Sequence, residues 1–294
     1  MNEDAQSMLI KLLIINLLNN WHNNRRPKPV ESYKKGQYSG KVTSVHDSEG
    51  ILSSITTYDQ NDFNNTPHYH ENTHISLVIR GGCREKKKED YERLPGMLTF
   101  YHAGEPHQVL QIGRSSKHIN LEIEQKFLNR YEINEQMLGQ ALIKNPDGKF
   151  LLLKIQQELL AADAGSDVSI RMLLLEFTSY AEKLSPEQPV WIRRIRQMLE
   201  EFWADNPSLE FLSTVSGVHP VTISKYFHKY FGCTLGQYLR KMKIEKTLAL
   251  INQGNYSLSE ITYLCGFADQ SHFIRTFKQM TSFLPAKYQL FSAG

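Results

Sequence analysis

The chain of 294 residues has few cysteines and no long hydrophobic run, and each absence excludes a class of protein. Three cysteines (Cys83, Cys233 and Cys265) are too few for a disulfide framework and show no paired metal-ligand spacing, which favours a reducing compartment. The apolar run at residues 8–18 is too short to span a bilayer, and no small-residue cleavage site follows it. We therefore expect a cytoplasmic protein without a membrane partner.

The net charge is small, and it is unevenly distributed along the chain. Lys and Arg number 34 against 31 Asp and Glu overall, but 12 against 7 from Val190 onward. The last third is therefore basic, and the remainder is slightly acidic. A basic domain is typical of a phosphate-binding surface, although a solvated basic face has the same composition. The length and the 40% hydrophobic content predict about two globular domains rather than a disordered chain.

Residues 42–124 consist of short apolar runs separated by Gly, Pro, Asn and Asp. β-branched and aromatic residues dominate runs such as 51–58 and 74–82, which predicts strands. Many short strands without intervening helices predict a β-barrel or jelly roll. The charge run at residues 84–92 is expected to be the solvated tip of a hairpin.

Histidines gather at two places in this strand-rich region. His68 and His70 are two residues apart, so on a strand they face the same side. A turn at residues 71–72 would bring His74 back toward them. A second segment, residues 95–107, ends in His107.

The two histidine segments resemble the two motifs of the cupin family. The first runs His68-x-His70, three residues, His74, six residues, Gly81, and the second contains Gly96, His102, Gly104 and His107. His74 stands where the family has Glu, and His102 stands where it has Pro. The resemblance implies that a divalent metal is held by four residues: His68, His70, His74 and His107.

Ligation by imidazole nitrogens suits Zn, Ni, Cu or Fe. Two other interpretations of the four histidines stay open. They can line the pocket of an organic ligand, or they can be structural residues that hydrogen-bond within the barrel.

The middle of the chain predicts two helices. Apolar residues recur at spacings of three and four over residues 151–162, and a second helical pattern covers residues 169–184. These helices can pack on the barrel, on each other or on a second subunit, so intramolecular packing and dimerisation are both open. Two prolines within residues 185–189 indicate an interdomain linker.

The last hundred residues contain an internal repeat. Residues 223–229 and 273–279 share the pattern apolar-x-basic-x-Phe, and Lys225 precedes Arg275 by 50 positions. Each segment follows a glycine turn, and a short apolar-periodic helix precedes each turn. Two copies of helix, turn and second helix with a basic outer face predict two helix-turn-helix motifs.

Residues 190–290 resemble the DNA-binding domain of the AraC/XylS family of transcription regulators. The second motif matches most closely, at Gly266-Phe267, Asp269, Ser271, Phe273, Arg275, Phe277-Lys278, Pro285 and Tyr288. Two departures concern us below. Lys243 replaces the usual arginine of the helix that bridges the motifs, and Ser282 replaces a glycine in a turn.

The predicted fold class is α+β and multidomain, with a cupin-like jelly-roll barrel plus helices and a C-terminal all-α domain with two helix-turn-helix motifs. The predicted parts are an N-terminal extension (1–29), a sensor barrel (30–149), a helical coupling or dimerisation segment with its linker (150–189) and the AraC-type DNA-binding domain (190–294).

Recognition helices enter the major groove of DNA by their N-terminal half. We therefore expect two sets of outward-facing residues to read bases, with Arg275 suited to guanine and Gln270 to adenine. These residues are Val221, Ser224 and Lys225 in the first motif and Gln270, Ser271, Ile274 and Arg275 in the second. Backbone phosphates are expected to contact Lys229, Lys278, Arg240 and Lys241.

The sequence thus predicts a sequence-specific DNA-binding regulator, such as a transcription activator, whose barrel senses a small molecule or a metal. Its expected partners are double-stranded DNA, an unknown effector, RNA polymerase and a second copy of the chain. Two alternatives remain: a metal-dependent cupin oxygenase or isomerase, and a constitutive regulator with an empty barrel. The first is disfavoured because the barrel shows no acid–base pair at catalytic spacing.

Overall fold

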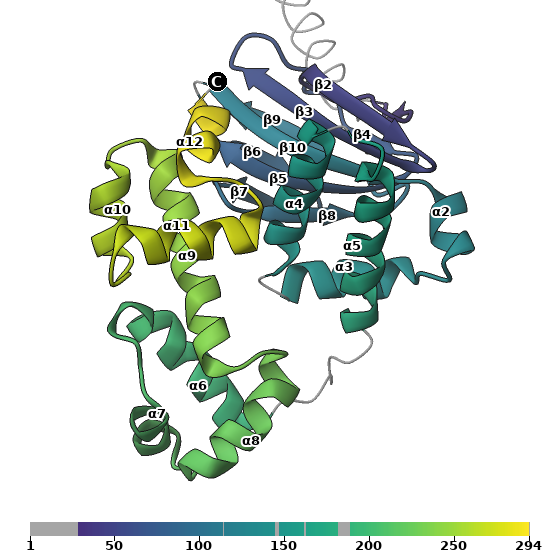
Figure 1. The fold of residues 1–294 in the computed structure, drawn as a ribbon. Helices are drawn as coiled ribbons and strands as arrows, with labels where there is room; N and C mark the ends of the chain where they lie inside the picture. The colour runs from purple at the N-terminus through teal and green to yellow at the C-terminus, as the bar shows by residue number, and fades with distance from the viewer. Residues whose placement is uncertain (1–28, 114, 145–146, 162, 182–188, 294) are drawn as a thin grey trace, which may run out of the picture.

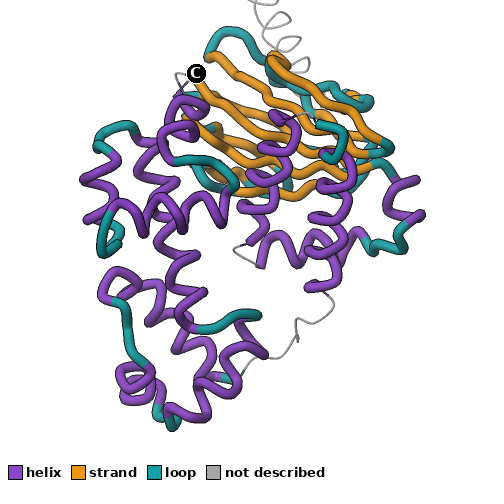
Figure 2. Tube along the Cα trace, in the orientation of Figure 1, coloured by secondary structure: helices purple, strands orange, loops and turns teal. Residues whose placement is uncertain are grey.

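The computed structural model describes residues 29–113, 115–144, 147–161, 163–181 and 189–293. Strands fill the first part of the chain and helices the rest, as the sequence predicts (Figures 1 and 2). The predicted extension, except for Pro29, and most of the predicted linker lie outside the described residues.

The strands form three sheets. The largest has the order β2-β3-β10-β5-β8, a smaller one has the order β7-β6-β9, and β1 pairs in parallel with β4. The strands are β1 (Glu31–Tyr33), β2 (Lys41–Ser48), β3 (Ile51–Asp59), β4 (His68–His70), β5 (Thr73–Arg80), β6 (Cys83–Lys86), β7 (Asp90–Arg93), β8 (Leu98–Tyr101), β9 (Gln108–Ile112) and β10 (Ser115–Ile123).

Strand β10 shows why the large sheet has two different faces. Its side chains alternate between apolar residues such as Ile119 and Leu121, which join the main core, and the polar Asn120, which faces the interior of the barrel. Because both faces are covered, nearly every β10 residue is buried.

Helices begin earlier than the predicted boundary at residue 150. The chain leaves the last strand at Ile123 and turns at once into helix, so the predicted barrel segment 30–149 ends in helices. These helices are α2 (Gln125–Arg130), α3 (Glu135–Lys144), α4 (Asp147–Ala161) and α5 (Ser166–Ala181). Helices α4 and α5 lie across one face of the large sheet (Figure 1). Packing within the chain, one of the two open interpretations of these helices, is therefore observed.

The C-terminal part is helical and contains both predicted helix-turn-helix units. The units are α7–α8 and α10–α11, and the long helix α9 bridges them. The elements are α6 (Val190–Phe202), η1 (Trp203–Asp205), α7 (Leu209–Ser216), α8 (Pro220–Phe231), α9 (Leu235–Gln253), α10 (Leu258–Leu264), α11 (Gln270–Thr281) and α12 (Pro285–Ala293).

The two helix-turn-helix units belong to different hydrophobic cores. The first unit has its own core, built with α6 around Ile195, Ile223 and Phe227. The second unit contributes Phe273 and Phe277 to a core that also contains the sheet and helices α2 to α5. The sensor and the second unit therefore share one apolar interior.

Cys83, Cys233 and Cys265 are free thiols and are buried. Among the residues that the structure describes, no helix is long and apolar enough to cross a membrane.

Lys243, which replaces the usual arginine, still braces the turn of the second unit. Lys243 lies on α9 with its side chain buried, and its ammonium donates a hydrogen bond to the carbonyl of Gly266 at 2.5 Å. The ammonium also lies 5.6 Å from the centroid of the Phe267 ring. Lysine therefore supplies the contact that fixes α9 against the turn.

Ser282, which replaces a glycine in a turn, adopts a left-handed backbone conformation that glycine takes at lower cost. It ends α11 in the left-handed region with φ of 62°, and the corresponding residue after α8, Gly232, has φ of 72°. A side chain in this region clashes with the backbone, whereas glycine has none to clash.

Replacing Ser282 by glycine should raise the free energy of unfolding by about 1 kcal/mol, because the strain is relieved. Urea denaturation of Ser282→Gly measures the change. The matched variant Gly232→Ser should lower the free energy of unfolding by a similar amount. Equal free energies of unfolding for the unaltered chain and both variants would contradict the prediction that Ser282 is strained.

Candidate functional site

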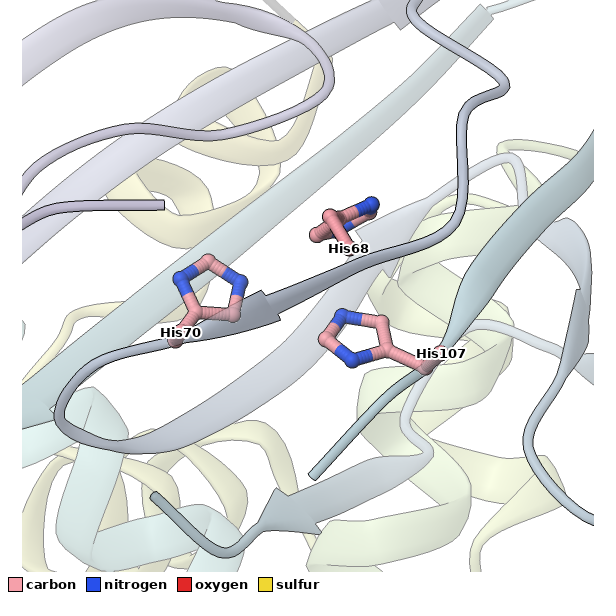
Figure 3. A group of neighbouring side chains, drawn as sticks. All are labelled: His68, His70 and His107. Atoms are coloured by element: carbon pink, nitrogen blue, oxygen red, sulfur yellow. The ribbon is translucent and has the colours of Figure 1, made fainter. Parts of the chain in front are cut away.

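Three of the four predicted metal-ligating histidines come together inside the barrel. His68 and His70 lie on β4, and His107 lies beside them just before β9 (Figure 3). One ring nitrogen from each lies within 4.8 Å of the other two, and all three side chains are buried. The backbones of His68 and His107 exchange hydrogen bonds of 2.9 and 2.8 Å, so strand pairing holds the cluster together.

Backbone carbonyls orient two of the three imidazoles. Nδ1 of His68 lies 3.0 Å from the carbonyl of Thr66, and Nδ1 of His107 lies 3.1 Å from that of Glu105. A carbonyl only accepts, so both Nδ1 atoms carry the proton and both Nε2 atoms carry a lone pair. Metal-ligating histidines commonly have this second hydrogen bond.

The polar atoms of the cluster also fit a metal ion. Nδ1 of His70 is buried and has no hydrogen-bond partner among the described residues. Nε2 of His68 is 3.2 Å from the hydroxyl of Ser39, which a ligand at that nitrogen would displace. A buried polar atom without a partner is costly, so the unpartnered nitrogen favours an additional ligand.

His74 does not join the three-histidine group. Its ring packs on His70 with centroids 4.1 Å apart, but its Nε2 lies 3.3 Å from Oδ1 of Asn120 on β10. The turn after β4 therefore brings His74 toward the cluster, as predicted, while its Nε2 has a partner in the neighbouring strand and its buried Nδ1 has none among the described residues.

Burial keeps the clustered histidines neutral at pH 7. It lowers the pKa of His107 to about 4, and burial together with the neighbouring His107 and His68 lowers that of His70 to about 2. The pKa values of His68 and His74 are lowered by burial as well. Neutral imidazole is the form that binds metals.

Aromatic residues from the segment before β2 cover the cluster. The Tyr33 ring stacks on His68 with centroids 4.1 Å apart. The Tyr38 ring lies 5.6 Å from that of His70 and 5.5 Å from that of His74. Neither tyrosine is among the residues that the sequence predicts for the site, because this packing joins residues that are distant in the chain.

A buried ion pair lies next to the cluster and was also missed. Glu85 on β6 accepts hydrogen bonds from the hydroxyls of Tyr91 and Tyr101 and from Arg93 at 3.2 Å. Burial raises the pKa of Glu85, but Arg93 together with the hydrogen bonds from Tyr91 and Tyr101 holds that pKa below its usual range. The Tyr101 ring in turn packs on His107, with centroids 4.2 Å apart.

Residues 84–92 do form a hairpin, but the predicted solvation does not extend to Glu85, which is 1% exposed. The available signal was the alternation along β6, in which Glu85 is in phase with the buried Cys83.

All predicted DNA-contact residues except Lys241 are exposed. The buried sides of α8 and α11 carry Ile223, Phe227, Phe273 and Phe277, as expected. The opposite sides carry the predicted base and phosphate contacts Val221, Ser224, Lys225, Lys229, Gln270, Ser271, Ile274, Arg275 and Lys278. Asp269 caps α11 by accepting a hydrogen bond from the backbone N–H of His272 at 2.7 Å, as predicted.

Two of the predicted contact residues have partners within the chain. The side-chain amide of Gln270 donates to the hydroxyl of Ser259 on α10. The ammonium of Lys241 lies 2.6 Å from a carboxylate oxygen of Asp147 on α4, where it links two parts of the chain. Lys241 is therefore placed at an internal contact, in contrast to its expected role on DNA phosphates.

Comparison with known proteins identifies the helical part. Residues 212–290 match the family described as "Helix-turn-helix domain". The HTH-type transcriptional activator RhaS of Enterobacter sp. (strain 638) is 26% identical over 114 residues, or 39% of this chain and 41% of that one. The probable transcription factor PqrA of Proteus vulgaris is 28% identical over 81 residues, or 28% of this chain and 66% of that one. The chain thus spans less than two thirds of these relatives.

Two solved structures are also similar. ToxT from Vibrio cholerae is 13% identical over 84% of this chain and 100% of that one, with a TM-score of 0.36. The C-terminal domain of AraT from Geobacillus stearothermophilus is 26% identical over 37% of this chain and 87% of that one, with a TM-score of 0.33.

Two helix-turn-helix units and these sequence matches define the C-terminal part as the DNA-binding domain of a transcription regulator. More particularly, these matches bear out the resemblance of this domain to the AraC/XylS family.

The depressed pKa of His107 predicts that the barrel loses stability in acid. The unfolded chain takes up the proton near pH 6.5 and the folded chain near pH 4, so stability falls as the pH drops between these values. His107 alone should lower the free energy of unfolding by about 2 kcal/mol between pH 7 and pH 5. Urea denaturation at both pH values measures this change.

The variant His107→Gln should lose this part of the acid sensitivity. His102→Gln, which alters an exposed histidine of the same loop, should keep it. An unchanged pH dependence in His107→Gln would contradict the role assigned to burial.

Proposed function

We propose that the whole chain is a sequence-specific DNA-binding transcription regulator and that its barrel senses a divalent metal or a small molecule. The exposed faces of α8 and α11 carry the DNA-binding half of this proposal. The cluster of His68, His70 and His107 supports the sensing half. The sensor and the second reading helix, α11, would then lie in parts of the chain that share one core, whereas α8 belongs to the other core.

For DNA, α8 and α11 would enter two successive major grooves. Arg275 extends from the exposed side of α11, where its planar fork can bond O6 and N7 of guanine. Gln270 would reach adenine after releasing Ser259. Lys229 and Lys278 would contact phosphates and set affinity rather than sequence preference.

For the metal, His68, His70 and His107 would be the ligands, and Zn, Ni, Cu or Fe are the ions that suit them. His74, the fourth residue implied by the cupin resemblance, lies outside this group; its Nε2 contacts Asn120, so its buried and unpartnered Nδ1 is the nitrogen that would join. Bound metal would supply a positive charge in a buried site, where its effect on neighbouring strands is large. If no metal binds, the same buried surface would hold an organic effector.

The proposal extends to partners and location. Exposed apolar side chains on the hairpin of α4 and α5, namely Leu160, Val168 and Met172, support a homodimer. RNA polymerase is the expected partner of an activator, and the cytoplasm is the compartment in which free thiols and DNA occur together.

We propose a regulator rather than an enzyme because RhaS and PqrA are named as an activator and a transcription factor. AdaA of Bacillus subtilis, 24% identical over 102 residues, is named as both an activator and a DNA repair enzyme. A constitutive regulator would instead show a DNA affinity that no metal or metabolite alters. Gel-shift titration of a DNA duplex selected by the full chain, with and without metal, tests the proposal.

Removing Arg275 should relax base preference at one position of the binding site. The variant Arg275→Ala should lose about 1–3 kcal/mol of discrimination there, which selection from a randomised DNA library measures. Lys278→Ala is the matched control, because a lost phosphate contact weakens all sequences alike. An unchanged preference in Arg275→Ala would exclude the proposed recognition surface.

Removing one histidine of the cluster should abolish stoichiometric metal binding. For His107→Ala, the loss should exceed the roughly 10–100-fold effect typical of outer-shell residues, measured by titration with zinc and nickel. His102→Ala should bind as the unaltered chain does. Absence of stoichiometric binding by the unaltered chain would reject the metal and leave the organic effector.

A further inference from the structure

The last turn of α12 is held against the sensor sheet by two cationic side chains. The guanidinium of Arg80, at the end of β5, donates a hydrogen bond to the carbonyl of Ala293. The ammonium of Lys117, on β10, donates to the carbonyl of Phe291 at 2.7 Å and lies 4.7 Å from the centroid of its ring. We call these two contacts the α12 clasp.

The chemistry of the clasp is specific to a helix end. Carbonyls in the last turn of a helix have no partners within the helix, and cations complement the negative end of its dipole. Lys117 is only 8% exposed, and burial together with the nearby Arg80 lowers its pKa. A buried ammonium is costly without an acceptor, so the Phe291 carbonyl has a strong partner.

Apolar packing continues the contact beneath the clasp. Phe283 and Tyr288 are buried in the core that also contains residues of β5 and β10, and Phe291 packs against it. The second helix-turn-helix unit is therefore joined to the sheet by polar contacts at its rim and by hydrophobic contacts below.

The strands that carry the clasp also carry part of the histidine site. β5 begins beside His74 and ends at Arg80. β10 contains Lys117 and, three residues later, Asn120, whose side chain meets His74. One pair of hydrogen-bonded strands thus connects His74, whose ring packs on His70 of the cluster, to α12.

We propose that the α12 clasp is the joint through which the sensor sheet sets the DNA affinity of the C-terminal domain. Its metal-dependent part rests on the proposed function, because a ligand at the cluster would act on α12 through β5 and β10. Two other ion pairs, Asp147–Lys241 and Lys149–Glu245, also join the sensor to α9. The sensor residues of both pairs lie on α4. Because α4 carries none of the four histidines, these pairs have no direct connection to the histidine cluster.

The test removes both cations from the full chain. The double variant Arg80→Gln, Lys117→Met should change the metal-free dissociation constant for the selected DNA duplex by at least about fivefold, the lower end of typical coupling between sites. The control Arg84→Gln, Lys126→Met loses the same charge from surface pairs away from α12 and should stay within twofold of the unaltered chain.

Hydrogen exchange shows whether the double variant is folded. Amides of residues 285–293 should lose protection, while those of β3 and α8 keep it. The conservative variant Arg80→Lys, Lys117→Arg should restore most of the DNA affinity. If amides throughout the double variant lose protection, that variant is unfolded and only the conservative variant tests the proposal. A conservative variant that fails to restore the DNA affinity then overturns the proposal that the α12 clasp is the joint.

Metal titration separates the joint from the proposed sensing. A fivefold change in metal-free DNA affinity supports the joint even if the unaltered chain binds no zinc or nickel, in which case only the metal proposal fails. If metal alters DNA affinity in the unaltered chain, the double variant should lose that effect and still bind the metal. A folded double variant that binds DNA like the control overturns the joint.

Discussion

The architecture depends on one continuous apolar contact, in which the large sheet, helices α2 to α5 and the second helix-turn-helix unit bury side chains in the same core. Burial of apolar surface is the main force in folding, and close packing leaves little room for independent movement. The sensor and the second unit therefore behave as one body. The first unit, with its separate core around Ile223 and Phe227, is joined to that body through α9 and the ion pairs on α4.

Exclusion of water also determines the charge state of the histidines in the barrel interior. Four imidazoles lie beside one another where few water molecules can reach them, so each remains uncharged at pH 7. Neighbouring carbonyls fix the protons of His68 and His107, and tyrosines close the site above them. A site of neutral, oriented lone pairs suits a metal cation or a hydrogen-bond donor, while burial disfavours protonation of the imidazoles.

The sequence predicts best those features that depend on residues close together in the chain. The glycine turns follow from local patterns and are confirmed, and Pro220 and Asp269 occupy the helix-start and cap positions that these residue types favour. The resemblance to cupin motifs also indicated that His107 would join His68 and His70.

The remaining features depend on contacts across the chain. Asn120 occupies a nitrogen of His74 from a distant strand, and Glu85 enters the barrel out of a run of charges. Lys241 pairs with Asp147 on α4, although its position in a basic helix resembles that of a phosphate contact. The early start of the helices at Gln125 could not be predicted from the sequence either, because nothing between the last strand and α2 resembles a linker.

The shared core has a practical consequence for work with the DNA-binding domain alone. Cutting the chain before α6 would expose the apolar side chains of α9, α11 and α12 that now rest on the sheet and on α4. Large exposed apolar patches promote association. A fragment of residues 190–294 would thus expose an apolar surface beside its DNA-reading helices. Aggregation of such fragments on DNA could be mistaken for cooperative binding.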